Sequence, residues 1–292
     1  MFELVQVGPQ SYYIMSPAKI GIYKPNETDV YLIDSGNDKD AGRKVRKILD
    51  EKGWKLKAII NTHSNADHIG GNRYLQQQYG CPIYAKGIEV DFTRHPVLEP
   101  SFLYGAYPLK ELRHKFLLAE ESEVSDITDR SFPQELEVIP LQGHFFDMIG
   151  IRTPDDTVFL ADCISSRETL EKYRIAFIYD VVAYLETLDR VEEMEGRIFV
   201  PAHAEAALDI KELIEFNRAQ VYEVADRILS ICETPQMTEN ILKQIFDGYN
   251  LTMNYEQYVL VGSTLRSYLS WLKDTEKMTA TIDNNCLLWE KA

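Results

Sequence analysis

The stretch N-T-H-S-N-A-D-H-I-G-G-N, residues 61–72, decides how this sequence is interpreted. It follows the apolar run 56–60, which is typical of a buried strand that leads into a loop. Four residues of the stretch carry side chains that commonly bind or surround metals: His63, Asn65, Asp67 and His68. Two imidazoles and a carboxylate at a strand end predict a metal-binding loop, with an ordinary polar surface loop as the alternative.

The end of this stretch predicts how the chain continues. Gly70 and Gly71 are expected to form a tight turn, because glycine adopts backbone conformations that other residues avoid. Asn72 is expected to cap a short helix over residues 73–79.

Apolar runs elsewhere predict further strands, several of which end in a polar residue. Before the loop we expect strands at 11–15, 20–23 and 30–33, a helix at 41–52 that ends at Gly53, and a strand at 82–85. After it we expect strands at 136–141, 149–153, 158–161 and 197–200. His144, Asp162 and His203 each follow one of these later strands. Because strand ends at one edge of a sandwich converge, these side chains are expected near His63 and His68.

The order of these segments resembles the metallo-β-lactamase fold superfamily over residues 1 to about 205. The loop matches the H-x-H-x-D-H signature except that Asn65 stands where the second histidine is expected. A Gly-His pair, an aspartate after an apolar strand and a Pro-x-His follow in the family's order. The resemblance implies an α/β fold, a four-layer αββα sandwich, as a catalytic domain over residues 1–205. It also implies that Asp34 supports the histidine loop by hydrogen bonds.

The resemblance further implies two metal sites. His63, Asn65 and His144 would face a first metal, and Asp67, His68 and His203 a second, with Asp162 between the two. A water or hydroxide held there would be the nucleophile, and Asp67 would be the catalytic residue that orients its proton. The expected cofactor is zinc, as one or two ions.

Asn65 leaves undecided how the first site binds a metal. A carboxamide oxygen is a weaker donor than imidazole, and zinc usually selects nitrogen or sulfur ligands. The alternatives are a weak first site, a harder ion such as iron or manganese, and an Asn65 that only forms hydrogen bonds.

Residues 92–133 interrupt the regular pattern with aromatic residues and prolines. We expect an irregular, lid-like insertion in which Phe102, Tyr104 and Tyr107 bind substrate, with a surface loop packed by its own aromatic side chains as the alternative.

Residues 206–292 predict a helical domain. Helices are expected at 209–232, 238–246 and 255–273, and a hairpin at 279–290, an order that resembles the winged-helix appendage of some superfamily hydrolases. Eight basic and thirteen acidic side chains in this segment have the wrong balance for binding phosphates, so no nucleic-acid partner is expected. The apolar and aromatic content of 254–273 predicts a homodimer.

The formal net charge of −15 disfavours nucleic acids as substrates. No apolar run reaches membrane-spanning length and the N-terminus lacks a signal pattern, so we expect a cytoplasmic protein without a membrane partner. The predicted function is a metal-dependent hydrolase acting on a small ester, thioester or amide. The alternatives are an iron-dependent oxidoreductase or dioxygenase on the same scaffold and, less favoured, a nucleic-acid processing hydrolase.

Overall fold

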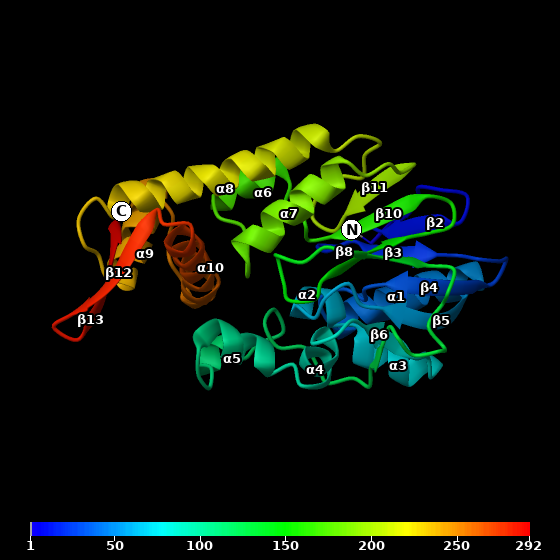
Figure 1. The fold of residues 1–292 in the computed structure, drawn as a ribbon. Coiled ribbons are helices and arrows are strands. Elements are labelled where there is room, and N and C mark those ends of the chain that lie inside the picture. The colour runs from blue at the N-terminus through cyan, green and yellow to red at the C-terminus, as the bar shows by residue number, and fades with distance from the viewer. Residues whose placement is uncertain (1) are drawn as a thin grey trace.

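Two β-sheets lie face to face, and helices cover the outer side of each sheet, so that the layers follow the order helix, sheet, sheet, helix (Figure 1). This computed structural model describes residues 2–292. The four-layer α/β sandwich that the sequence predicts is therefore confirmed. The N-terminal strands lie within the sandwich, and the last helices and hairpin lie together at one end of the molecule (Figure 1).

The first sheet carries the metal-binding loop predicted from the sequence. Its strands are antiparallel from β1 to β4 and parallel from β4 to β7, so the carboxyl ends of β4, β5 and β6 lie at one edge. Its seven strands, in spatial order, are β1 Leu4–Gln6, β2 Ser11–Ile14, β3 Ile20–Tyr23, β4 Asp29–Ile33, β5 Lys55–Ile60, β6 Ile83–Ala85 and β7 Ser125–Asp126.

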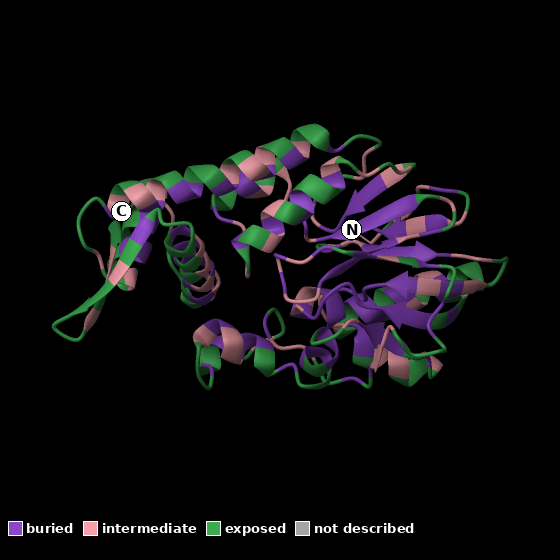
Figure 2. Ribbon diagram, in the orientation of Figure 1, coloured by how far each residue is buried: buried purple, intermediate pink, exposed green. Residues whose placement is uncertain are grey.

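The second sheet has the spatial order β11-β10-β9-β8, with β10 parallel to β11 and antiparallel to β9. Its strands are β8 Glu137–Pro140, β9 Ile149–Arg152, β10 Thr157–Ala161 and β11 Ile198–Pro201. The predicted strands of both sheets are present, and most of their residues are buried, as the purple strands of Figure 2 show, although Lys57 of β5 and Glu137 of β8 are exposed. Side chains such as Ile33, Ile60, Ile151 and Phe159 fill the space between the sheets.

The turn predicted at Gly70 and Gly71 is present, but the predicted reason for glycine there, a backbone conformation that other residues avoid, is wrong. Both residues have right-handed helical backbone angles, with φ of −62° and −85°, between α2 (Ala66–Ile69) and α3 (Asn72–Tyr79). Glycine is required by close packing: a Cβ on Gly70 would lie 2.4 Å from the backbone of Asn37, and one on Gly71 would lie 2.3 Å from Ser35 O.

The prediction that Asn72 caps α3 is also wrong, because Asn72 is the first residue of that helix and Gly71 precedes it. Its side chain is buried and exchanges two hydrogen bonds with Asn61, of 2.8 and 3.3 Å. This pair ties the end of β5 to α3. The helix expected at 41–52 is α1, Lys39–Lys52, which begins at the Asp38 cap and ends at Gly53.

The segment 92–133 is more regular than the sequence suggests. It holds the end of α4 (Glu89–Arg94), then α5 (Leu98–Tyr104), a short 3₁₀ helix at Lys110–Leu112, and β7. Pro100 is compatible with α5 because it lies in the first turn, where a backbone N–H has no partner within the helix. Whether this segment acts as a lid stays a prediction.

Two helices between β10 and β11 have no counterpart in the sequence-based expectations. These are α6, Arg167–Tyr173, and α7, Val181–Glu192. The carboxylate of Asp180 caps α7 by accepting hydrogen bonds from the backbone N–H groups of Val182 and Ala183. With Leu188 buried against the second sheet's cluster, α7 contributes to its outer cover.

The C-terminal part contains the three helices and the hairpin that the sequence predicts: α8 Lys211–Ile231, α9 Thr238–Tyr249, α10 Tyr255–Asp274, β12 Met278–Asp283 and β13 Cys286–Lys291. Asn284 and Asn285 form the turn with φ of 46° and 62°, values that asparagine tolerates better than most residues. The similarity to a winged helix stays a prediction.

One hydrophobic cluster joins the second sheet to the C-terminal helices, through residues such as Leu160, Leu188, Ile228 and Leu269. Much of the apolar content of α10 is buried within this chain, whereas Tyr255 and Tyr258 are exposed. The homodimer and the division at residue 205 stay predictions. Within residues 2–292, no helix has both the length and the apolar character needed to span a bilayer.

Candidate metal centre

Asp34, at the end of β4, fixes the loop that follows β5. Its Oδ1 accepts a hydrogen bond from Thr62 N at 2.8 Å, and its Oδ2 accepts from Thr62 Oγ1 at 2.7 Å and lies 2.8 Å from His68 Nδ1. The carboxylate is 3% exposed. The expectation that Asp34 supports the histidine loop by hydrogen bonds is confirmed.

Four imidazole rings converge, and all four use the Nδ1 atom for a hydrogen bond and turn the Nε2 atom toward the centre. Each Nδ1 is within hydrogen-bonding distance of an acceptor: His63 with Thr62 Oγ1 at 3.0 Å, His68 with Asp34 Oδ2 at 2.8 Å, His144 with Phe177 O at 3.0 Å, and His203 with Pro17 O at 2.9 Å. Carbonyl and carboxylate oxygens only accept, and Thr62 Oγ1 already donates its hydrogen to Asp34, so each Nδ1 is the donor. Each Nε2 is therefore turned away from the partner of Nδ1 and into the centre, as in histidines that bind metal.

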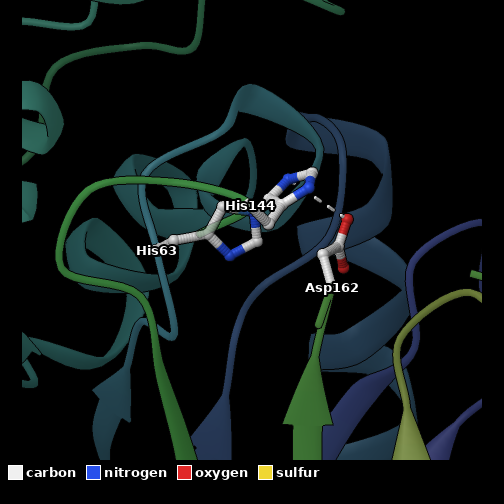
Figure 3. Close-up of side chains that lie close together, drawn as sticks. All are labelled: His63, His144 and Asp162. Carbon is white, nitrogen blue, oxygen red and sulfur yellow. Dashed lines mark ion pairs between the residues drawn. The ribbon is translucent and has the colours of Figure 1, made fainter. Parts of the chain in front are cut away.

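These Nε2 atoms form two groups with one carboxylate between them. His63, His144 and Asp162 form one group and Asp67, His68 and His203 the other, each with its candidate ligand atoms within 4.8 Å of one another. Figure 3 shows the first group, with Asp162 and His144 facing each other.

Asp162 reaches both groups. Its Oδ1 lies 3.1 Å from His68 Nε2, and its Oδ2 lies 3.2 Å from His203 Nε2 and 3.7 Å from His144 Nε2. It follows β10, whose register is shifted between Phe159 and Ala161, and Ala161 has a φ of 50°. This backbone irregularity directly precedes the carboxylate.

The ionisation of these groups reflects burial and the two carboxylates. Burial lowers the pKa of His63 well below its usual range. Burial also acts to lower the pKa of His203, but Asp162 and Asp67 outweigh it and raise that pKa to about 10. For Asp67, burial acts to raise the pKa, yet His68 and His203 outweigh it and hold the pKa below the usual range. The centre thus has a negative potential that stabilises positive charge.

Asn65 lies at the first group, where its amide faces a histidine. Its Oδ1 is 3.2 Å from His144 Nε2, and its Nδ2 donates to Glu99 Oε1 at 2.8 Å. Because Nδ1 of His144 carries the hydrogen, Nε2 and the amide oxygen are two acceptors that face each other, and burial keeps the pKa of His144 below its usual range.

The donor set fits a cation. The Nε2 atoms of His63 and His68 and the Oδ1 of Asp162 are buried and make no well-directed hydrogen bond in the chain, although the last two atoms lie 3.1 Å apart. Unpartnered buried donors and acceptors cost free energy, and facing acceptors repel. A divalent metal bound to these atoms would remove both costs, and imidazole nitrogens with carboxylate oxygens suit zinc, iron or manganese.

Sequence reasoning missed two buried glutamates, Glu89 and Glu99, which hold this loop. Glu89 is fully buried and accepts hydrogen bonds from Ser64 N at 3.0 Å and Asp147 N at 2.9 Å. Glu99 accepts from Asn65 Nδ2 and from Ala66 N at 3.0 Å. No motif marks either residue; the only signal is a glutamate in the first turn of a helix whose other inward positions are mostly apolar.

Burial raises the pKa of Glu89 from 4.5 to about 7. Below pH 4.5 the folded and unfolded chains are both protonated at this residue. Between pH 4.5 and 7 the folded protein keeps the proton and the unfolded chain loses it, so the contribution of Glu89 to stability decreases as pH rises through this window. We expect the difference in unfolding free energy, wild type minus Glu89→Gln, to decrease from pH 5 to 7 and to level off above.

Urea unfolding in the presence of a chelator at a series of pH values measures this difference. The control is Glu171→Gln, which removes an exposed carboxylate on α6. A difference that is constant with pH, or that grows with rising pH, would contradict the assignment.

A cavity of about 380 Å³ opens beside Asp162 and His203. One wall comes from α6 and the segment after it, and the opposite wall comes from α10. Its other lining residues are Ser165, Thr169, Tyr173, Ile175, Ala176, Phe177, Gln257, Leu260, Val261 and Thr264. Among these described residues there is neither lysine nor arginine.

The aromatic residues predicted to bind substrate lie elsewhere. Phe102 packs against Phe146 and Tyr179, with ring centroids 5.1 and 5.7 Å away. Phe102 and Tyr104 line a separate cavity of about 610 Å³ between α5 and α10, and Tyr107 is 71% exposed. The structure thus brings together the seven predicted metal-site residues but does not bring these aromatic residues to the cavity beside Asp162; their role in substrate binding stays a prediction.

Comparison with known proteins agrees with this geometry. A family model described as the metallo-beta-lactamase superfamily matches residues 17–203. The probable metallo-hydrolase YybB of Bacillus subtilis is 26% identical over 195 residues, which cover 63% of this chain and 80% of that protein. The hydroxyacylglutathione hydrolase GloC of Haemophilus influenzae is 28% identical over 137 residues, covering 46% of this chain and 57% of that enzyme.

The similarity in fold extends through the C-terminal part. A β-lactamase domain protein from Burkholderia ambifaria superposes with a TM-score of 0.76 at 15% identity, covering 99% of this chain and 94% of that one. At this identity the similarity shows the fold alone. It includes α8, α9 and α10, which lie beyond the residues that the family model matches.

Proposed function

Because the chain belongs to the metallo-β-lactamase superfamily, we propose that it is a metal-dependent hydrolase of small esters, thioesters or amides with an uncharged acyl group. The observation that carries this proposal is the convergence of four imidazole Nε2 atoms and two carboxylates beside a cavity whose described lining includes neither lysine nor arginine. Proteins that resemble parts of this chain include hydrolases by name, such as the hydroxyacylglutathione hydrolase GloC.

The proposed metal ligands are those that the sequence predicts. His63, Asn65 and His144 would hold a first ion, and Asp67, His68 and His203 a second, with one oxygen of Asp162 available to each. The proposed ion is zinc, and iron or manganese would suit the mixed donors of the first site. When bound, such ions lower the pKa of water and polarise a carbonyl oxygen.

Asp67 is the proposed catalytic residue. Its Oδ2 lies 3.4 Å from His203 Nε2, and its side chain is 34% exposed, so it borders the space that an attacking water would occupy. Its lowered pKa keeps it ionised, which lets it accept a hydrogen bond from that water and orient it toward the acyl carbon.

The cavity limits the substrate by charge. Recognition of an anionic acyl group commonly uses Arg or Lys, and the described lining offers hydroxyl, amide and apolar groups instead. Tyr173, Leu260 and Val261 would contact an aliphatic or aromatic acyl group, and Gln257 is a neutral hydrogen-bonding group at the same wall. We propose that uncharged acyl groups are favoured over carboxylated ones.

A comparison of butyryl and succinyl thioesters of one thiol tests this substrate class. The zinc-loaded protein should hydrolyse the butyryl ester with the higher kcat/KM. The variant Gln257→Arg should shift the ratio toward the succinyl ester by about 10- to 100-fold, because a hydrogen bond to a charged group contributes about 1.5–3 kcal/mol. The matched control is Gln244→Arg, the same change at an exposed position of α9 away from the cavity. A preference of the wild type for the succinyl ester would contradict the proposal.

A second candidate, an iron-dependent oxidoreductase or dioxygenase, is favoured by one observation. The group of His63, His144 and Asp162 supplies two imidazoles and one carboxylate, a set that also suits ferrous iron. Metal analysis of protein purified without added metal, together with oxygen uptake, distinguishes the two. Nucleic acids remain the least favoured substrates because the net charge is −15.

A further inference from the structure

Glu99 on α5 contacts the metal loop at two adjacent points. Its Oε1 accepts a hydrogen bond from Asn65 Nδ2 at 2.8 Å, and its Oε2 accepts from the backbone N–H of Ala66 at 3.0 Å. The residue is 4% exposed, so these partners are not replaced by water. Asn65 is thereby held between Glu99 on one side and His144 on the other.

These contacts decide which atom of the Asn65 amide faces the first metal site. The two ends of a carboxamide have nearly the same shape, and rotation about its last torsion exchanges the oxygen and the nitrogen. The amide nitrogen donates to Glu99 Oε1, so Oδ1 turns toward His144 Nε2, 3.2 Å away. Only the oxygen end of an amide can bind a metal.

We propose that Glu99 is a positioning residue that makes Asn65 a metal ligand. By holding the amide nitrogen, it presents Oδ1 to the first site beside His63 and His144. The inference rests on the proposed metal centre and adds a residue from the segment 92–133, which the sequence connects with a lid. Glu99 on α5 would then control how tightly the first site binds its metal, and it would not affect the second site.

A purely structural role for Glu99 predicts a different result. Because Glu99 also accepts the first free N–H of α2, its loss could destabilise the loop as a whole. Such destabilisation would weaken both sites. The positioning role predicts a selective loss at the first site.

The variant Glu99→Gln separates these roles. The introduced glutamine can accept the Ala66 N–H with its oxygen and donate its own N–H to a flipped Asn65 Oδ1, which would turn the amide nitrogen toward His144. We expect titration of the metal-free protein with Zn²⁺ against a competing chelator to show one equivalent weakened about 10- to 100-fold, the usual effect of residues that orient metal ligands. The other equivalent and the thermal unfolding midpoint of the metal-free protein should change little.

A rescue experiment tests the dependence on the amide. In the background Asn65→His, the ligand is a ring nitrogen, and a flip of the amide no longer matters. Glu99→Gln should therefore weaken zinc binding much less in this background than in the wild type, a non-additive effect expected of residues that act through one another. The control is Glu171→Gln, the same change at an exposed residue of α6, which should leave both zinc equivalents within about threefold.

Glu99→Asp provides a second variant. It keeps the carboxylate but shortens the side chain, so that one carboxylate no longer reaches both Asn65 Nδ2 and Ala66 N; we expect a loss in the same equivalent. If Glu99→Gln binds both zinc equivalents as the wild type does, or weakens both equally in either background, the positioning role is wrong. If the wild-type protein binds only one equivalent of zinc, the positioning role of Glu99 is also wrong, but the proposal of a hydrolase with a single metal stands. Wild-type protein that binds no zinc overturns this inference and the proposed zinc hydrolase together.

Discussion

Replacement of Asp162 by alanine is expected to abolish hydrolysis and to remove tight binding of both metals. The carboxylate lies 3.1 Å from His68 Nε2 and 3.2 Å from His203 Nε2, and it also faces His144. Its loss would take one oxygen donor from each proposed site. A metal that polarises the substrate contributes several kcal/mol to the transition state, so kcat/KM should fall by about 10³-fold or more.

Zinc content after dialysis and the hydrolysis of a butyryl thioester are the measurements. The matched control is Asp155→Ala, which removes a carboxylate that accepts hydrogen bonds from Ser11 Oγ at 2.6 Å and Gln10 N at 2.7 Å, away from the metal centre. This control should lose stability but keep its metal. Two tightly bound zinc ions in Asp162→Ala would show that the carboxylate is not a ligand.

Replacement of Gly143 by alanine is expected to cause the largest loss of stability among single methyl additions at the glycines described here. Gly143 has a φ of 121°, a value that residues with a Cβ rarely adopt, and its added Cβ would lie 2.3 Å from the backbone N and Cα of Tyr184 at the start of α7. Backbone strain and overpacking each cost about 1–3 kcal/mol, so the loss should be about 2–6 kcal/mol. A shift of the backbone at residue 143 would also displace His144, the next residue.

Gly53 supplies the matched control. It also has a positive φ, of 66°, but no heavy atom lies within 4 Å of its added Cβ. Gly53→Ala should cost about 1–2 kcal/mol, the penalty of the left-handed conformation alone. Urea unfolding of the two variants measures the difference. If both variants lost the same unfolding free energy, the close approach of the added Cβ at residue 143 to Tyr184 would cost nothing, and the prediction would be wrong.

The sequence was sufficient for most of the strands, with β1 and β7 as the exceptions, and for the residues that converge at the strand ends. His63 and His68 are close in sequence, and His144, Asp162 and His203 each follow a buried strand whose apolar run is easy to recognise. Convergence then follows from strand order alone. The same reasoning failed for Glu89 and Glu99, because their role depends on which backbone N–H groups they meet after folding.

The helices α6 and α7 were also beyond the sequence-based interpretation. Their hydrophobic faces are short, and α7 depends on Asp180 as a cap and on packing against the second sheet. Likewise, the turn at Gly70 and Gly71 was predicted correctly, but the sequence does not show why glycine is needed there: the backbone of Asn37 and Ser35, on a neighbouring segment, leaves no room for a Cβ. Contacts between distant segments leave no local pattern in a sequence.

The wall that α10 contributes to the cavity has a consequence for how specificity can change. Gln257, Leu260, Val261 and Thr264 face the cavity from a helix that supplies none of the proposed metal ligands. In the proposed function, the reacting groups come from residues before 204 and part of the substrate selectivity comes from residues after 254. Mutation and selection can therefore retune the choice of substrate by exchanging side chains on one surface of one helix, while the reaction centre is inherited unchanged.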